Sequence, residues 1–190
     1  NLLKGCVLMP MHPTFPASPF EVLAPDVRWT PSADDRQDLP YEKLLPPLVA
    51  NVRKEVHAWR ASGYEGASET SKALLQWWFE THHLVGQADG TQSEFRYYFA
   101  QREAVETAIW LYEVEQARDP YQLMRYDSSG LVSKAMFAEH WARYVFKLAT
   151  GVGKTKVLSL LIAWAYFHKR YEPNSPLSTN FLLIAPNIIV

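Results

Sequence analysis

A short loop at residues 149–155 constrains the fold of this 190-residue chain more than any other feature; it reads Ala-Thr-Gly-Val-Gly-Lys-Thr. The segment at 143–148 before it predicts a strand, and the apolar spacing at 154–171 after it predicts a helix. An apolar run at 181–185, ended by Pro186, is typical of a strand covered on both faces. Strand, loop, helix and strand form a crossover unit, so the sequence predicts an α/β fold that begins a parallel, doubly wound sheet.

The loop also has the residues of a phosphate-binding site. Glycines at 151 and 153 allow backbone N–H groups to turn towards an anion at a helix N-terminus. Lys154 can reach the β- and γ-phosphates of a nucleotide, and Thr155 can place its hydroxyl on a Mg²⁺ ion bound to them. We therefore predict Lys154 and Thr155 as the catalytic pair. The predicted nucleotide-binding residues of the loop are Thr150, Gly151, Val152, Gly153, Lys154 and Thr155.

Prolines divide the rest of the chain. Residues 1–47 hold nine of the 13 prolines, a density that excludes long helices and central strands and predicts an extended arm. Residues 48–130 predict a mainly helical region, with helices after Pro47, from Ser68 and over 99–117, and a hairpin turn at 89–90. Residues 131–190 are predicted to hold a short helix near 134–141 and the beginning of the nucleotide-binding domain.

Composition narrows the class of protein. The net charge of −1 gives no global basic field that would hold DNA. The single cysteine excludes an internal disulfide and fits a reducing compartment. Because no signal peptide and no 18-residue apolar stretch is present, we predict a soluble, cytoplasmic protein without a membrane partner. The chain begins without an initiator methionine and stops at Val190 inside an apolar run, so we interpret it as a fragment.

Aromatic and charged side chains carry more general expectations. The tryptophans are expected to anchor the core rather than to stack on bases; those concerned are Trp59, Trp77, Trp78, Trp110, Trp141 and Trp164. Charged side chains on the predicted helices are expected to be solvated, namely Glu103, Glu106, Glu113 and Glu115 over 99–117, and Arg53, Lys54 and Arg60 before them. A nuclease role for Asp26 and a metal site at His57, His82 and His83 are disfavoured, because neither has the companion residues that such a site needs.

The loop resembles motif I of superfamily 2 helicases and translocases, especially the motor subunits of restriction enzymes. Leu148 stands where the strict P-loop (Walker A) pattern has its first glycine, and this departure is shared with that family. Upstream, residues 99–104 read Phe-Ala-Gln-Arg-Glu-Ala and resemble the Q motif, whose glutamine reads the adenine edge. The resemblance implies ATP as the nucleotide.

The Q-like segment assigns two further residues to the nucleotide. The amide of Gln101 offers a donor and an acceptor, which match N6 and N7 of adenine. Phe99 is assigned to the ring that stacks on the base, with Tyr97 and Tyr98 as alternatives. A solvated glutamine at the start of an amphipathic helix is the other interpretation.

Downstream of the loop, residues 183–187 resemble motif Ia, a strand that ends in a loop touching the nucleic-acid backbone. On this resemblance Pro186 and Asn187 are predicted nucleic-acid contacts. A plain core strand ended by a proline would have the same residues, so both interpretations stay open.

Three further stretches, at 46–49, 59–64 and 98–106, make the whole chain similar to the N-terminal part of type III restriction enzyme Res subunits, which are restriction-type DEAD-like helicases. The resemblance implies a RecA-like motor that hydrolyses ATP with Mg²⁺ to move along or remodel DNA in restriction-modification or phage defence. It also implies a methyltransferase or another defence subunit as partner. The acidic Mg²⁺ motif, the arginine finger and the second motor domain are then expected beyond Val190, so the full-length protein is the expected ATP hydrolase and this fragment alone is expected to be inactive.

Two other functions remain open at this point. A P-loop regulatory NTPase with a helical protein-interaction module would explain the loop without DNA. An all-helical adaptor formed by residues 1–130 could exist beside either enzyme. Gln101 and the Ala-Thr-Gly form of the loop favour the DNA-dependent ATPase.

Overall fold

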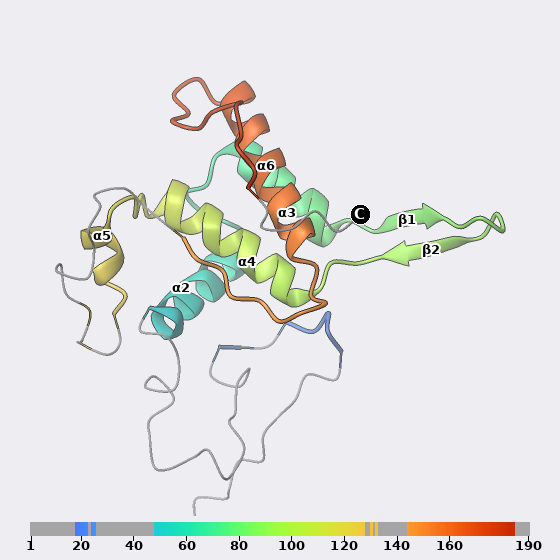
Figure 1. Cartoon of the computed structure of the whole chain (residues 1–190), viewed down its shortest axis with the longest axis horizontal. Helices are drawn as coiled ribbons and strands as arrows, with labels where there is room; N and C mark the ends of the chain where they lie inside the picture. The colour runs from blue at the N-terminus through green and yellow to red at the C-terminus, as the bar shows by residue number, and fades with distance from the viewer. Residues whose placement is uncertain are drawn as a thin grey trace, which may run out of the picture.

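The computed structural model describes residues 18–22, 24–25, 48–127, 130, 132 and 144–184. Most of the predicted proline-rich arm, the short helix predicted near 134–141, and both predicted nucleic-acid contacts, Pro186 and Asn187, lie outside these residues. Figure 1 shows a body of helices from which a two-stranded hairpin projects.

The first two helices follow the apolar spacing of the sequence. Helix α2 (Val49–Ala61) buries Val52, Val56 and Trp59 at helical intervals. Helix α3 (Glu69–Glu80) is capped by Ser68, whose hydroxyl accepts from the Ser71 N–H. Both helices were predicted, and the structure confirms them.

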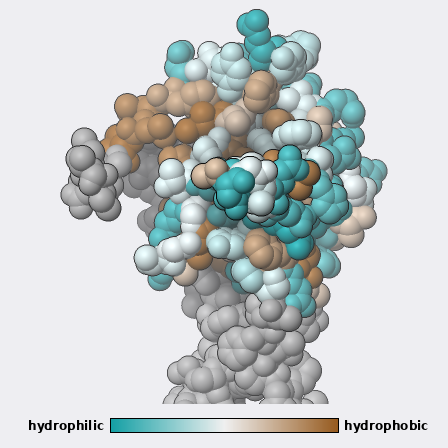
Figure 2. Space-filling model, turned by 90° about the vertical axis from the view of Figure 1, so that its right-hand side faces the viewer, coloured by the Kyte–Doolittle hydropathy of each residue, from teal (hydrophilic) through white to brown (hydrophobic). Residues whose placement is uncertain are grey.

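A β-hairpin follows α3. Strands β1 (His83–Gly86) and β2 (Gln92–Phe95) are antiparallel, with His83 opposite Phe95 and Gly86 opposite Gln92. Gly90, at the predicted turn, has a φ of 83°, a conformation that favours glycine. The hairpin projects from the helical body in Figure 1, and its largely hydrophilic tip faces the viewer in Figure 2.

The helix predicted over 99–117 is divided in the structure. Helix α4 (Phe99–Ile109) passes into a π-helical segment, η2 (Trp110–Val114). A short helix, α5 (Pro120–Met124), then begins after the capping residue Asp119. Helix α6 (Lys154–Tyr171) starts directly after the glycine loop, as predicted, and packs against α3 and α4.

The parallel sheet predicted from 143–148 and 181–185 is not formed in the described part of the chain. There, residues 144–148 and 181–184 pair with no strand, and the one sheet is the antiparallel hairpin. Val145, Leu182 and Ile184 are 89%, 84% and 85% exposed. The physical reason is that an apolar run encodes burial, whereas a parallel strand also needs neighbouring strands to receive its hydrogen bonds. The described part is therefore a mixed α/β structure with mainly helical content.

One hydrophobic core joins α2, α3, α4 and α6. Val56, Leu75, Val105 and Ile109 have no exposed surface. Four of the predicted tryptophan anchors are buried here, namely Trp59, Trp78, Trp110 and Trp164. The prediction is wrong for Trp77, which is 58% exposed beside the hairpin, and Trp141 lies outside the described residues.

Hydrophobic side chains also gather on the surface. Figure 2 shows them in the upper part of the molecule, where α6 and the 181–184 segment lie in Figure 1. Leu158 and Tyr166 of α6 are 46% and 44% exposed. Even so, no helix in the part of the chain that the structure describes is long and apolar enough to cross a membrane.

Candidate nucleotide-binding site

The glycine loop has the backbone of an anion-binding nest. Gly151 and Gly153 have φ angles of 84° and 78°, which strain any residue with a Cβ. The N–H groups of Lys156 and Val157 donate to the Gly153 carbonyl at 2.9 and 3.3 Å. The five N–H groups from residue 151 to residue 155 find no acceptor among the described residues. They and the positive end of the α6 dipole are thus available to an anion.

Lys154 and Thr155 occupy the first turn of α6 and are both exposed. Neither side chain makes a hydrogen bond or ion pair with another described residue. The ammonium group and the hydroxyl are therefore free to meet phosphate oxygens and a hydrated cation. These are the groups that the sequence predicted as the catalytic pair.

Gln101 lies against the loop although it is 51 residues away in sequence. Its Nε2 donates to the Val152 carbonyl oxygen at 2.8 Å, and its Oε1 accepts from the Tyr98 N–H at 3.0 Å. The side chain is 6% exposed. The structure therefore brings together the Q-like glutamine and the phosphate-binding loop, two features that the sequence could only name separately.

Gln101 also gives Gly153 a second reason to be glycine. A Cβ at position 153 would lie 2.4 Å from Gln101 Nε2, a separation that no packed carbon and nitrogen tolerate. At Gly151, a Cβ would meet nothing within 4 Å. Sequence analysis assigned both glycines to backbone conformation and missed this packing role, because only the fold reveals which side chain faces residue 153.

A hollow of about 400 Å³ lies between the base of the hairpin and the start of α4. Its walls include Phe20, Phe79, Phe95, Tyr97 and Phe99. Burial raises the pKa of the Tyr97 hydroxyl, as expected for a ring set among aromatic neighbours.

Contacts on each side join this hollow to the loop helix and to α2. Lys156, one residue past Thr155, places its Nζ 5.7 Å from the Phe95 ring centre and so links α6 to β2. The predicted stacking residue Phe99 meets the Arg60 guanidinium 5.2 Å from its ring centre. Phe95 was not among the aromatic residues predicted from the Q-like segment.

Glu106 is hydrogen-bonded to Arg102, which lines this hollow. The burial of Glu106 corrects the prediction that it lies on a solvated acidic face. It has no exposed surface and accepts from Arg60 Nε, from Arg102 Nε at 2.8 Å and from the Tyr64 hydroxyl at 2.8 Å. Burial, and after it the Glu106 charge, raises the pKa of Tyr64. Arg60 was also predicted to be solvated, yet its side chain is 10% exposed.

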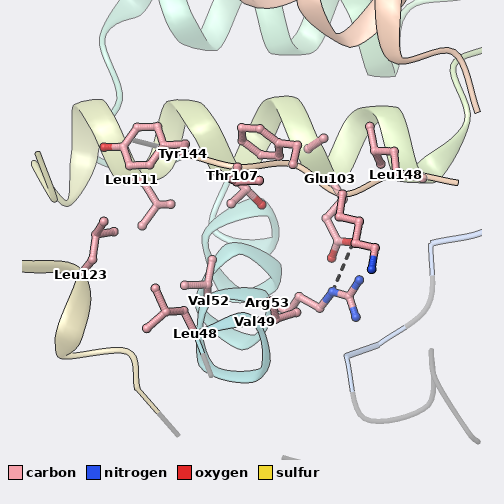
Figure 3. Close-up of a pocket in the computed structure, with 15 residues that line it drawn as sticks. Leu48, Val49, Val52, Arg53, Glu103, Thr107, Leu111, Leu123, Tyr144 and Leu148 are labelled. Atoms are coloured by element: carbon pink, nitrogen blue, oxygen red, sulfur yellow. Dashed lines mark ion pairs between the residues drawn. The ribbon is translucent and has the colours of Figure 1, made fainter. Parts of the chain in front are cut away.

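A second hollow, of about 280 Å³, lies between α2, α4 and the 144–148 segment. Figure 3 shows Leu48, Val52, Leu111 and Leu148 around it, with the Arg53–Glu103 ion pair at one side. Arg53 Nε and Glu103 Oε2 are 3.5 Å apart. Its walls are mostly apolar and include the 144–148 segment that leads into the loop. We therefore interpret this hollow as a packing site for that segment and not as a catalytic site.

The histidines of the hairpin region have protein partners. His82 Nδ1 lies 2.8 Å from Glu94 Oε1, and His83 Nε2 lies 2.8 Å from the Trp77 carbonyl oxygen. Among the described residues, no group of three or more histidine, cysteine, aspartate or glutamate side chains is arranged to hold a metal ion. A cation at the loop would instead be held through the nucleotide and Thr155.

Comparison with known proteins adds the family to this geometry. No curated protein and no solved structure matches the chain significantly. The family model described as "Type III restriction enzyme, res subunit" matches residues 92–190, which include β2, Gln101, the glycine loop and α6. Because this match covers more than half of the sequence, the chain belongs to the family of type III restriction enzyme res subunits.

Proposed function

We propose that this chain is the ATP-binding N-terminal part of a DNA-dependent ATPase, a helicase or translocase of restriction-modification or phage-defence type. The observation that carries the proposal is the loop itself. Among the described residues, its N–H groups at 151–155 and the Lys154 side chain have no partner, and Gln101 is hydrogen-bonded to the Val152 carbonyl. Membership in the res-subunit family supports the same function.

ATP would be held at both of its ends. The backbone nest and Lys154 would bind the phosphates, and the Thr155 hydroxyl would help to hold Mg²⁺. The ion, when bound, would supply positive charge beside the phosphates. Gln101 still has a second N–H and a second lone pair for the adenine edge, and the neighbouring aromatic hollow offers ring faces to the base.

The apolar runs at 144–148 and 181–184 support a RecA-like sheet in the working motor. Tyr144, Phe146 and Leu148 pack against the core on one face, whereas Val145, Leu182 and Ile184 are largely exposed. Strands of a parallel sheet are covered on both faces, so we infer that these two runs become central strands when further strands pair with them.

DNA is the proposed polymer on which the motor acts. Pro186 and Asn187 are the proposed backbone contacts, and a methyltransferase or another defence subunit is the proposed protein partner. The family match supports both proposals. Such a protein works on intracellular DNA, so the proposed location is the cytoplasm.

The test is the ATPase rate of the full-length protein with and without duplex and single-stranded DNA, beside a Lys154→Ala variant. We expect DNA to raise the rate several-fold and the variant to abolish it. Turnover that ignores DNA and prefers GTP would replace the motor by a regulatory NTPase. Turnover that survives Lys154→Ala would place the nucleotide elsewhere.

A further inference from the structure

Helices α4 and α6 each carry one half of the candidate nucleotide site at their N-terminal ends. A half-buried carboxylate in η2, which continues α4, connects the two helices again near the C-terminal end of α6. We propose that Glu113, with Ser71, Trp164 and His168, forms a positioning cluster that keeps Gln101 in register with the glycine loop. This inference rests on the proposed function, because it names residues that position the same site from a distance.

Glu113 contacts both neighbouring helices. Its Oε1 accepts from the Ser68 N–H at 2.5 Å, and its Oε2 accepts from the Ser71 hydroxyl. Ser71 Oγ in turn accepts from Trp164 Nε1 of α6 at 2.8 Å, in a buried hydrogen bond. The carboxylate is 12% exposed, so these bonds replace the water that a charged group would otherwise need.

A second contact runs from Glu113 directly to α6. His168 Nε2 lies 3.6 Å from Glu113 Oε2, slightly beyond a direct hydrogen bond; a protonated imidazole at this distance would attract the carboxylate. His168 Nδ1 lies 2.7 Å from Ser175 Oγ, and the ring is 6% exposed. Glu113 is therefore connected to α6 directly at His168 and through Ser71 at Trp164, two positions four residues apart on the face that α6 buries.

These groups could be mistaken for a serine–histidine–glutamate catalytic chain. Ser175, however, is 6% exposed, and its Oγ already lies within hydrogen-bond distance of the His168 ring and the Leu177 N–H. A nucleophile must reach a substrate carbon. A buried hydroxyl with two hydrogen-bond partners cannot reach a substrate. The cluster therefore holds the helices together and performs no catalytic step.

The π-helical segment η2 explains how Glu113 reaches this position. In an uninterrupted α-helix, at about 100° per residue, Glu113 would point roughly 120° away from Gln101. Glu113 lies inside η2, whose wider turn rotates each residue by less than an α-helix does. Its side chain is therefore turned back towards the side of the helix that carries Gln101, and its closeness to His168 places it against α6. The Glu115 N–H, which bonds the Trp110 carbonyl at 2.9 Å, marks the wide turn.

The Glu113 cluster and the contact between Gln101 and the glycine loop lie at opposite ends of the same pair of packed helices. At a rise of about 1.5 Å per residue, Glu113 lies roughly 18 Å along the helix from Gln101. Between these points α4 and α6 pack through the hydrophobic core. A helix is stiff over this length, so sliding of α6 past α4 must disturb both polar connections together. Loss of the Glu113 contacts should therefore weaken the hydrogen bond between Gln101 and the Val152 carbonyl.

The experiment measures hydrogen exchange in the nucleotide-free full-length protein. The peptides that report are 98–104 and 153–160, because the N–H groups of Gln101, Arg102, Lys156 and Val157 are hydrogen-bonded in the first turns of α4 and α6. We expect Glu113→Gln to speed exchange in both peptides by roughly fivefold or more, a common size for coupling between sites. The matched control is Glu115→Gln, which lies two residues away and loses contacts to Arg125 and Tyr126 but none to α6.

A double-mutant cycle with Gln101→Ala separates positioning from general loosening. If Gln101 transmits the effect, Glu113→Gln adds no further exchange in peptide 153–160 once Gln101 is alanine. Equal acceleration in both backgrounds, or acceleration no larger than that of Glu115→Gln, would overturn the proposal. Ser71→Ala breaks the same chain of bonds and replaces Glu113→Gln if that variant does not fold.

ATP titration of the same variants keeps this inference distinct from the proposed function. We expect Glu113→Gln to raise the KM for ATP more than it changes kcat. If the unaltered protein binds no ATP, the proposed function fails, while the exchange cycle still decides whether Glu113 positions the loop.

Discussion

Two buried polar side chains on α4, Gln101 and Glu106, lie five residues apart and have opposite characters. Glu106 has no exposed surface, and two guanidinium groups and a tyrosine hydroxyl bond its oxygens. Gln101 is also buried, but its amide makes one donor and one acceptor bond, and it touches a loop whose five N–H groups find no acceptor among the described residues. We expect the fully bonded Glu106 to stabilise the fold, and Gln101, whose amide keeps a second N–H and a second lone pair, to serve the proposed ligand.

Glu106→Gln should give the largest effect on stability. It leaves the guanidinium groups of Arg60 and Arg102 without their buried counter-charge, and removal of one partner from such a network costs about 3–5 kcal/mol. The measurement is the free energy of unfolding in urea. Glu69→Gln, whose carboxylate is 91% exposed beside Lys72, is the control and should change this free energy by less than about 1 kcal/mol. A stable Glu106→Gln protein that had lost ATP affinity would reverse the roles of the two residues.

Gly153→Ala should give the largest effect on the nucleotide site. The new methyl group collides with Gln101 Nε2 at 2.4 Å, and a displacement of about 1 Å at a phosphate site can lower activity by roughly 100-fold. ATP affinity, measured by calorimetry, should fall by roughly 10- to 100-fold. Gly151→Ala causes a similar φ strain without the collision, so this variant should lose less ATP affinity than Gly153→Ala.

The collision also predicts a rescue. Gln101→Ala removes the amide that Gly153→Ala strikes, so the double variant should bind ATP better than Gly153→Ala alone. Equal affinities of the single and double variants would mean that backbone strain, and not the contact with Gln101, keeps position 153 as glycine.

Local patterns predicted much of this molecule. The spacing of Val52, Val56 and Trp59 predicted α2, Ser68 predicted the start of α3, and the loop predicted where α6 begins. Each of these signals lies within a few residues of the structure that it encodes. The positive φ angles of Gly151 and Gly153 agree with the backbone conformation expected from the loop, because this conformation depends on adjacent residues; its nucleotide chemistry stays a prediction.

Features that depend on distant partners were missed. Glu106 meets Arg60 across 46 residues and Glu113 meets Ser68 across 45, so neither could be told from a solvated carboxylate by helical spacing. The assignment of Gln101 to the nucleotide came from a family resemblance and not from any local pattern, and its hydrogen bond to the Val152 carbonyl was not predicted. The parallel strands were expected from their apolar runs, yet pairing requires other strands that these runs do not specify.

Gln101→Glu tests the partly bonded side of the comparison with a smaller change. The glutamate keeps an acceptor for the Tyr98 N–H but has no N–H for the Val152 carbonyl. Loss of one hydrogen bond costs about 1 kcal/mol, so ATP affinity should fall by roughly fivefold to tenfold. A carboxylate at this buried position also has a desolvation cost, so the free energy of unfolding should fall as well, but by less than in Glu106→Gln. Gln76→Glu, on an exposed face of α3, is a control for the added charge. A loss of stability as large as that of Glu106→Gln would show that Gln101 serves the fold alone.

Glu172→Gln should give the smallest effect on stability. It tests whether exposure, rather than charge, decides how much a carboxylate contributes to the free energy of unfolding. Hydrogen bonding by the Thr70 side chain, and after it by the Thr70 N–H that donates to Glu172 Oε1 at 3.1 Å, lowers the pKa of the Glu172 carboxyl below its ordinary value of 4.5. A lowered carboxyl pKa stabilises the fold above the ordinary value, and this contribution is lost as the pH falls through the folded value. Because solvent screens this partly exposed group, the variant should be less stable at pH 7 by only a few tenths of a kcal/mol, and the difference should shrink below about pH 4.5 in urea titrations. A pH-independent difference, or one that approached that of Glu106→Gln, would show that burial does not set the cost of losing a carboxylate in this chain.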